Sequence, residues 1–126
     1  MTFLLYARKD ETGERLKERI QGLELNYGME SFETIENLIR RLRQPVHGFS
    51  MAVILAGSRS ELNQILEAGD LLGSIRTIII LPDRKAETVT AALKLHPRYM
   101  SYADGDFLDV SMVAGRMLGR SYSAAV

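Results

Sequence analysis

The sequence holds few side chains of the kinds that carry out catalysis. Its two histidines are His47, followed by a glycine, and His96, followed by a proline. Neither has a serine or aspartate at a spacing typical of a catalytic pair, and a general base must be positioned beside the proton it removes. The chain has no cysteine, which excludes disulfides, thiolate metal ligands and a cysteine nucleophile. We therefore predict that the protein is not an enzyme and uses no metal or cofactor.

Charged and hydroxyl side chains gather at the expected starts of two helices. Asp10 and Glu11 follow the first apolar run, and acids in a first helical turn usually stabilise the helix dipole. Backbone N–H groups at a helix start can bind a phosphate-like anion. The residues that would assist them are Arg8, Lys9, Ser58 and Arg59. No glycine-rich phosphate loop accompanies these residues. A solvated rim of balanced charge is the simpler interpretation, and a site for a small anion or nucleotide is the alternative.

Length and charge narrow the class of protein. The 126 residues carry 16 Lys and Arg against 16 Asp and Glu, and 46% are hydrophobic, which predicts a single folded domain. A net charge of zero lacks the basic footprint of a general nucleic-acid binder. No apolar run approaches the ~20 residues that cross a bilayer, and no basic and then apolar leader opens the chain. We therefore expect a cytoplasmic protein whose partners are neither nucleic acid nor membrane.

Short apolar runs alternate with amphipathic stretches along the whole chain. The runs that predict strands are Thr2–Ala7, Glu24–Tyr27, Met51–Ala56, Thr77–Leu81 and Arg98–Tyr102. Strands separated by helices favour a parallel sheet with right-handed crossovers and helices on both faces. Five such units are too few for an eight-unit barrel. The predicted fold class is therefore α/β, a flavodoxin-like (βα)5 three-layer sandwich with strand order 2-1-3-4-5.

The helix starts are predicted from capping residues. The predicted caps are Ser58, Asp83 and Asp106, and the first two helices are expected to start near Asp10–Thr12 and near Ser31. Glu61 follows Ser58 at the spacing of a capping box. The second strand has the least apolar sequence of the five and is expected to end at Gly28. The last helix is expected to run from Phe107 to about Arg120, with residues 121–126 as a loose end.

In its architecture the chain resembles a CheY-like response-regulator receiver domain. The resemblance spans nearly all of the sequence and is carried best by Thr77–Leu118, which reads TIIILPD, then a helix with AALKL, then PRYMSYADGD and the closing helix. Receivers place an acid pair for Mg²⁺ after strand one and a phosphoacceptor aspartate at the end of strand three. They also place a Ser or Thr after strand four and a lysine in strand five. The corresponding positions here hold Ala7, Arg8, Ala56, Gly57, Pro82 and Tyr102.

The resemblance implies a pseudo-receiver that lacks the phosphoacceptor aspartate. Phosphoryl transfer to a carboxylate needs a metal that neutralises the transferred group, and a site for Mg²⁺ needs acidic oxygen ligands. The implied function is a non-phosphorylatable module of bacterial two-component signalling, with the Tyr102 ring filling the vacated pocket. The opening YARKDE is also similar to the first strand and helix of TIR domains, but the later strands do not sustain that similarity.

The last helix has a second face that suits a partner. At 100° per residue, the side chains that face the sheet are Val110, Val113, Ala114 and Met117. The opposite side gathers small and apolar residues, namely Leu108, Ser111, Met112, Gly115 and Gly119. Two glycines four residues apart let another backbone approach closely. In receivers, helix four, strand five and helix five form a common association surface. We predict that this helix binds a protein partner or a second copy, as a homodimer; incidental exposure of single apolar residues is the alternative.

Overall fold

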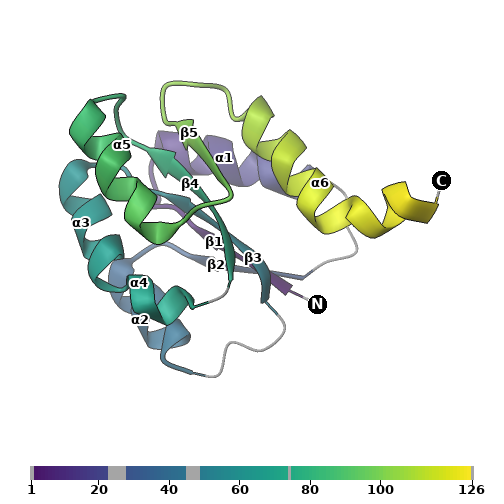
Figure 1. Cartoon of the computed structure of the whole chain (residues 1–126), viewed down its shortest axis with the longest axis horizontal. Helices are drawn as coiled ribbons and strands as arrows, with labels where there is room; N and C mark the ends of the chain where they lie inside the picture. Colours follow the sequence, from purple (N-terminus) through teal and green to yellow (C-terminus); the bar gives the residue numbers. More distant parts are fainter. Residues whose placement is uncertain (1, 23–27, 45–48, 74, 126) are drawn as a thin grey trace.

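The computed structural model describes residues 2–22, 28–44, 49–73 and 75–125, with side chains up to Leu118. Its strands are all parallel and form one sheet in the order β2-β1-β3-β4-β5, which confirms the predicted topology. The strands are β1 (Thr2–Tyr6), β2 (Gly28–Phe32), β3 (Phe49–Leu55), β4 (Arg76–Leu81) and β5 (Tyr99–Tyr102). Figure 1 shows this sheet between two layers of helices.

Helices cover both faces of the sheet. One face packs against α1 (Glu11–Gln21) and α6 (Leu108–Ala125). The other packs against α2 (Ile35–Leu42), α3 (Arg59–Glu67), α4 (Gly69–Leu72), α5 (Ala86–Ala92) and the 3-10 turn η1 (Leu93–Leu95). Helix α6 continues to Ala125, past the predicted end near Arg120. In the described part of the chain, no helix is long and apolar enough to cross a membrane.

The inner strands contribute side chains to two separate hydrophobic cores, because successive side chains of a strand point to opposite faces of the sheet. In β1, Phe3 and Leu5 pack on the α1 and α6 side, whereas Leu4 and Tyr6 pack on the side of α2 to α5. Strand β4 shows the same alternation, and its residues from Ile78 to Leu81 are completely buried. Burial on both faces explains why these strands read as continuous apolar runs in the sequence.

The second strand and the second helix begin later than the sequence predicts. The predicted strand Glu24–Tyr27 lies outside the described residues, and Gly28, expected to end it, opens β2 instead. Ser31 lies within β2 and therefore cannot cap the next helix. The cap is Thr34, whose Oγ1 accepts the Asn37 N–H at 3.2 Å. Because β2 is an edge strand with no fully buried residue, its sequence carries only a faint apolar pattern.

Next to the carboxyl edge of the sheet, the helix start expected near Asp10–Thr12 and the predicted cap Ser58 are both confirmed. The carboxylate of Asp10 accepts the Gly13 N–H at 2.8 Å, and the hydroxyl of Ser58 accepts the Glu61 N–H at 3.1 Å. Gly13 also has a steric role, because a Cβ there would lie 1.9 Å from the Arg8 carbonyl oxygen. Only glycine allows this close approach, which sets the path of the loop that carries Arg8.

The last two predicted caps are shifted. Asp83 does not cap α5: its carboxylate accepts the Lys85 N–H at 2.9 Å, and α5 begins at Ala86 without a side-chain cap. Such a bond from an Asp to the backbone two residues later closes a turn instead of starting a helix. Asp106 makes the same kind of bond to the Leu108 N–H at 3.0 Å, so α6 begins one residue after the predicted Phe107.

Candidate functional site

The strands β1 and β3 end side by side at one edge of the sheet, which is the usual ligand-binding edge of an open parallel sheet. The next residues, Ala7 and Ala56, are buried. Their N–H groups donate to the carbonyls of Phe32 and Ile80 at 3.1 and 2.9 Å, respectively. Two methyl groups therefore occupy the positions where the resemblance implies acids. Among the residues that the structure describes, no cluster of three or more His, Cys, Asp or Glu could hold a metal ion.

A buried carboxylate reaches this edge from the following helix. Glu61, in the first turn of α3, is only 4% exposed, and both of its oxygens have partners. Oε1 accepts the Gly57 N–H at 2.7 Å, and Oε2 accepts the Tyr6 hydroxyl at 3.0 Å. The Nε of Arg8 lies 3.3 Å from Oε2. The end of β1, the loop after β3 and the start of α3 are thereby joined at one point.

The sequence does not predict that Glu61 contacts the other three groups of this network, for two reasons. In a capping box, Glu61 would accept the N–H of the cap residue Ser58, but it reaches one residue further back, to Gly57. The structure does bring the predicted residues Arg8 and Gly57 together, since a Cβ on Gly57 would lie 4.0 Å from the Arg8 Cδ. Tyr6 and Glu61 are 55 residues apart, and only the packing of α3 on β1 pairs them.

The network keeps the Tyr6 phenol protonated. Burial raises the pKa of Tyr6 far above its usual range, and the charge and hydrogen bond of Glu61 raise it further, while Arg8 opposes the shift. A protonated phenol is the donor that the carboxylate needs. Arg8 supplies the counter-charge from the solvent side, where 62% of its side chain is exposed. Ion pairing and hydrogen bonds offset the cost of burying the Glu61 carboxylate. Both of its oxygens are occupied by donors from the chain, namely Tyr6, Gly57 and Arg8.

A cleft of about 300 Å³ lies beside this network, between the first turns of α2 and α3. The carboxylates that line it belong to Glu33, Glu36 and Glu61. Of the predicted anion ligands, Arg8 and Ser58 also line the cleft, but Arg59 donates to a side chain of its own helix, and Lys9 is exposed outside the lining. Three carboxylates against one guanidinium give the cleft a negative charge, which does not favour the predicted anion.

The remaining residues of the predicted pocket lie around the ends of β4 and β5. The half-buried Tyr102 packs on the core that α2 to α5 cover. The guanidinium carbon of Arg84 lies 4.0 Å from the centroid of the Tyr102 ring. The Nη2 and Nε groups of Arg84 donate hydrogen bonds to the Asp104 carboxylate, at 3.0 and 3.3 Å respectively. These bonds hold the pKa of Asp104 below its usual value. Arg84 thus ties the loop that Pro82 begins to the loop after β5.

Comparisons with solved structures establish the architecture. The chain matches a response-regulator receiver protein from Pseudoalteromonas atlantica over 100% of both chains, with a TM-score of 0.71 and 12% identity. It matches a CheY-like receiver domain protein from Methanospirillum hungatei over 98% of both, with a TM-score of 0.69 and 10% identity. The chain has a receiver fold.

Other comparisons leave the family open. A candidate pilus assembly-related protein from Burkholderia pseudomallei shares the receiver fold with a TM-score of 0.67 and 17% identity, over 94% of this chain and 90% of that one. At such identities the likeness concerns the fold alone. No family model matches the sequence, and no curated protein matches it.

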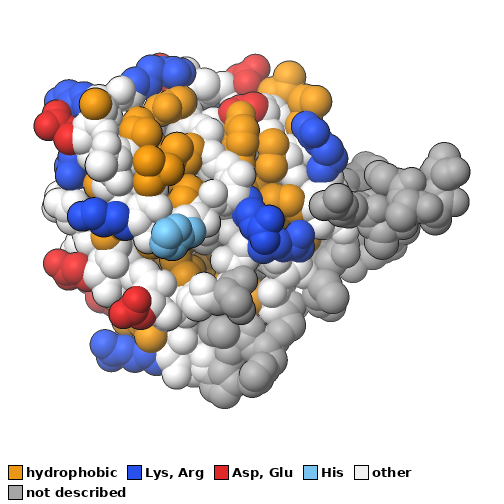
Figure 2. All heavy atoms as spheres, viewed as in Figure 1, with side chains coloured by type: hydrophobic (Ala, Val, Ile, Leu, Met, Phe, Trp, Pro, Cys, Tyr) orange, Lys and Arg blue, Asp and Glu red, His pale blue; other side chains and the backbone are white. Residues whose placement is uncertain are grey.

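In this receiver fold, α6 packs on the sheet much as its sequence predicts. Val110 and Ala114 are buried, as is Leu118, while Val113 and Met117 are partly buried. Figure 2 shows hydrophobic side chains gathered over α5, and again over β5 and the adjoining part of α6. The face drawn in Figure 2, which carries α5, β5 and α6, therefore exposes several apolar side chains.

The predicted interface residues divide into three groups. Leu108 and Met112 are exposed, at 48% and 55%. Ser111 is buried, and its hydroxyl donates to the Leu108 carbonyl at 2.8 Å, so it does not belong to the exposed face. Gly115 is half-buried, and the surroundings of Gly119 lie outside the part that the structure describes. The exposed face of α6 is thus carried by Leu108 and Met112, with the exposed Arg116 one turn further along the helix.

Proposed function

We propose that the chain is a receiver-fold signalling module that accepts no phosphoryl group and works by binding protein. The observation that carries this proposal is the closed network around Glu61. A carboxylate nucleophile needs a free oxygen and a metal that neutralises the incoming group. The oxygens of Glu61 are instead occupied by Tyr6, Gly57 and Arg8. At the end of β3, Ala56 and Gly57 offer no nucleophile at all.

A phosphoryl analogue tests the first half of the proposal. Beryllofluoride with Mg²⁺ mimics an acyl phosphate, so we expect the amide NMR spectrum of the chain to stay unchanged when both are added. A stoichiometric response that requires Mg²⁺ would overturn the proposal. Glu61→Gln is the informative variant in that event, because a response that disappears in Glu61→Gln would identify Glu61 as the acceptor.

The second half of the proposal places the contact on the last helix. Leu108 and Met112 are four residues apart, so they lie on the same side of α6, and together they form an exposed apolar strip. Burying such a side chain completely is worth about 1.5–3 kcal/mol, and roughly half of that remains to be gained here because Leu108 and Met112 are about half exposed. The occupant is another protein or a second copy of the chain.

Light scattering tests whether the partner is a second copy of the chain. If the chain forms a homodimer through α6, Met112→Arg or Gly115→Arg should give a monomer with an unchanged circular dichroism spectrum. Gln64→Arg is the matched control, because Gln64 is exposed on α3, which covers the other face of the sheet and is not part of the side formed by α5, β5 and α6. A wild-type chain that stays monomeric at high concentration would reject the homodimer and leave a different protein as the partner.

A further inference from the structure

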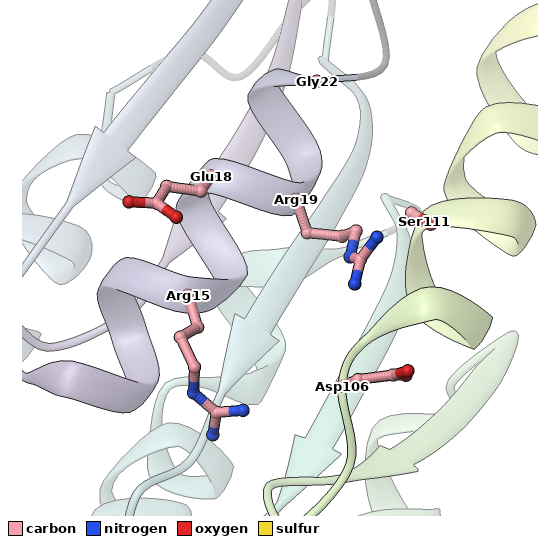
Figure 3. Close-up of a pocket in the computed structure, with 6 residues that line it drawn as sticks. All are labelled: Arg15, Glu18, Arg19, Gly22, Asp106 and Ser111. Atoms are coloured by element: carbon pink, nitrogen blue, oxygen red, sulfur yellow. The ribbon is translucent and has the colours of Figure 1, made fainter.

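A groove of about 520 Å³ runs between α1 and α6, on the face of the sheet opposite the Glu61 network. Its walls are Arg15, Glu18, Arg19 and Gly22 on the side of α1, and Asp106 and Ser111 on the side of α6. Figure 3 shows the guanidinium groups of Arg15 and Arg19 extending from α1 toward α6. The carboxylate of Glu18 points away from the groove on the other side of α1 (Figure 3). The groove is therefore open, polar and edged by two cations.

The two arginines are held differently. Arg15 donates to the Gly105 carbonyl at 3.3 Å, and its guanidinium carbon lies 5.3 Å from the centroid of the buried Phe107 ring. These contacts fix the side chain at the mouth of the groove and leave other N–H groups free. Arg19 lies one turn later and is exposed. Its place in the last turn suits the helix dipole, but that effect does not require the guanidinium to face α6.

Among the residues that the structure describes, neither Arg15 nor Arg19 forms an ion pair. The ion pairs of the described residues are Arg8–Glu61, Arg41–Glu30 and Arg84–Asp104. Asp106, on the opposite wall, accepts the Leu108 N–H at 3.0 Å, and in Figure 3 its carboxylate points away from α1. Two guanidinium groups one helical turn apart are thus available to bidentate anionic partners.

The exposed apolar strip of α6 borders this groove. Leu108 is three residues before Ser111, the groove residue of α6, and residues three apart on a helix are neighbours. Met112 follows Leu108 by four residues and extends the strip. One face of the molecule therefore presents two cations beside two exposed apolar side chains. A small anion would use only the cations, whereas a chain segment with acidic and apolar side chains would use both.

We infer that the groove between α1 and α6 binds an acidic amphipathic helix of a partner protein. This inference rests on the proposed function and names the chemistry of the partner. Carboxylates on the incoming helix pair with Arg15 and Arg19, and its apolar residues cover Leu108 and Met112. A second copy does not fit as well, because its α1 is not acidic: Glu11, Glu14 and Glu18 are balanced by three basic residues on the same helix. The apolar side of α1 is also already buried in the core.

Fluorescence anisotropy with a designed peptide tests the inference. The probe is a labelled peptide of about 18 residues, or five helical turns, with leucines at every third or fourth position flanked by glutamates. A second peptide carries lysine at each glutamate position. We expect the whole chain to bind the acidic peptide, more weakly as salt rises, and to bind the basic peptide at least tenfold more weakly. Arg19→Glu should weaken acidic binding by about tenfold, as expected for loss of one charged contact.

The controls separate this inference from folding and from the proposed function. Arg19→Glu places a negative charge in the last turn of α1, so we expect it to lower the melting temperature by no more than a few degrees and to leave the circular dichroism spectrum unchanged. Arg59→Glu on α3 changes the same charge outside the groove and should leave peptide binding unchanged. Equal binding of both peptides, equal loss in the two variants, or no acidic binding would overturn the inference. None of these results affects the outcome of the beryllofluoride experiment, which tests the proposed function independently of peptide binding.

Discussion

The hydroxyl of Tyr6 donates a 3.0 Å hydrogen bond to the carboxylate of Glu61, which joins the end of β1 to the first turn of α3. Both side chains are buried, and Arg8 balances the charge from the solvent side. The edge of a parallel sheet that commonly receives a ligand is here filled by groups of the chain itself. The contacts of Glu61 with Tyr6 and Arg8 would have to break before Glu61 could accept a phosphoryl group, and these same contacts stabilise this edge of the sheet.

Removing the Tyr6 hydroxyl should be costly. Tyr6→Phe keeps the ring in its core and deprives the buried Glu61 carboxylate of one donor. A hydrogen bond to a buried charged group contributes about 1–3 kcal/mol, so we expect that loss in the free energy of unfolding, measured with urea. Tyr99→Phe is the control, because the hydroxyl of Tyr99 donates to the less buried Asp109 and should cost less. Equal losses in the two variants would contradict a special role for Glu61.

The raised pKa of Tyr6 predicts a loss of stability in alkali. Unfolded tyrosine titrates near 10, and Tyr6 in the folded chain titrates above that value. A group whose pKa is raised by folding stabilises the protein fully below the unfolded pKa and loses that contribution as pH rises through the folded one. The expected fall is about 1.4 kcal/mol per pH unit above pH 10.

Difference measurements isolate the Tyr6 contribution from the other groups that titrate in alkali. The stability difference between the wild type and Tyr6→Phe should be constant below pH 10 and shrink above it. Tyrosinate absorbance gives a second readout: one of the five tyrosines should ionise only as the protein unfolds. A wild type in which all tyrosines ionise before unfolding would be incompatible with the buried hydrogen bond.

Restoring an acid at the end of β3 should destabilise the chain. A Cβ on Gly57 would lie 3.4 Å from the Glu61 Oε1, so Gly57→Asp places a second carboxylate beside a buried one. Like charges at this distance raise one pKa strongly, and we expect a loss of about 1–3 kcal/mol at pH 7. Urea unfolding should show a smaller loss at pH 5, where protonation relieves the repulsion.

The matched control for Gly57→Asp is Gly57→Ala, which adds a methyl group without a carboxylate. In Gly57→Ala the new Cβ makes an ordinary contact and the backbone needs no unusual dihedral, so the change should stay within about 0.5 kcal/mol. If the alanine variant lost as much stability as the aspartate variant, the loss would be steric and the electrostatic argument would fail.

The strands that the sequence predicts well are those buried on both faces. β3 and β4 appear as unbroken apolar runs because each of their faces enters a core. The strand β2 was misplaced because it lies at the sheet edge, where side chains are only partly buried and little pattern is left. The cap predicted at Asp83 is wrong because an aspartate suits both a helix cap and a turn, and only the backbone path distinguishes the two.

The sequence predicts only some of the residues of the candidate site. Counting strands predicts that Ala56 and Gly57 follow the third strand, and they do follow β3; their assignment to a degenerate phosphorylation pocket stays a prediction. Glu61 was recognised only as part of a cap, because its partner Tyr6 is 55 residues away and no local pattern links them. The cations of the α1 and α6 groove were missed for the same reason: Arg15 and Arg19 read as an ordinary charged helix face until α6 packs beside them.

The carboxylate of Asp109 predicts a second pH dependence, in acid. Burial raises its pKa, but hydrogen bonds from Ser101, Tyr99 and the backbone outweigh burial, so the net pKa is lowered. The Ser101 and Tyr99 hydroxyls donate at 2.7 and 2.8 Å. A group whose pKa is lowered by folding stabilises the protein above its unfolded pKa, near 3.9 for aspartate, and loses that contribution as pH falls through the folded value.

Ser101→Ala should therefore destabilise the chain in a pH-dependent way. The loss in free energy of unfolding should be about 1 kcal/mol at pH 7, because the carboxylate is partly exposed, and should shrink toward pH 3 as Asp109 becomes protonated. The pKa of Asp109, followed by carboxyl carbon NMR, should rise in the variant. Ser111→Ala is the matched control: Ser111 is equally buried but donates to the Leu108 carbonyl, which does not titrate. Its effect should be the same at both pH values, and a parallel pH dependence in the two variants would show that Asp109 is not the group responsible.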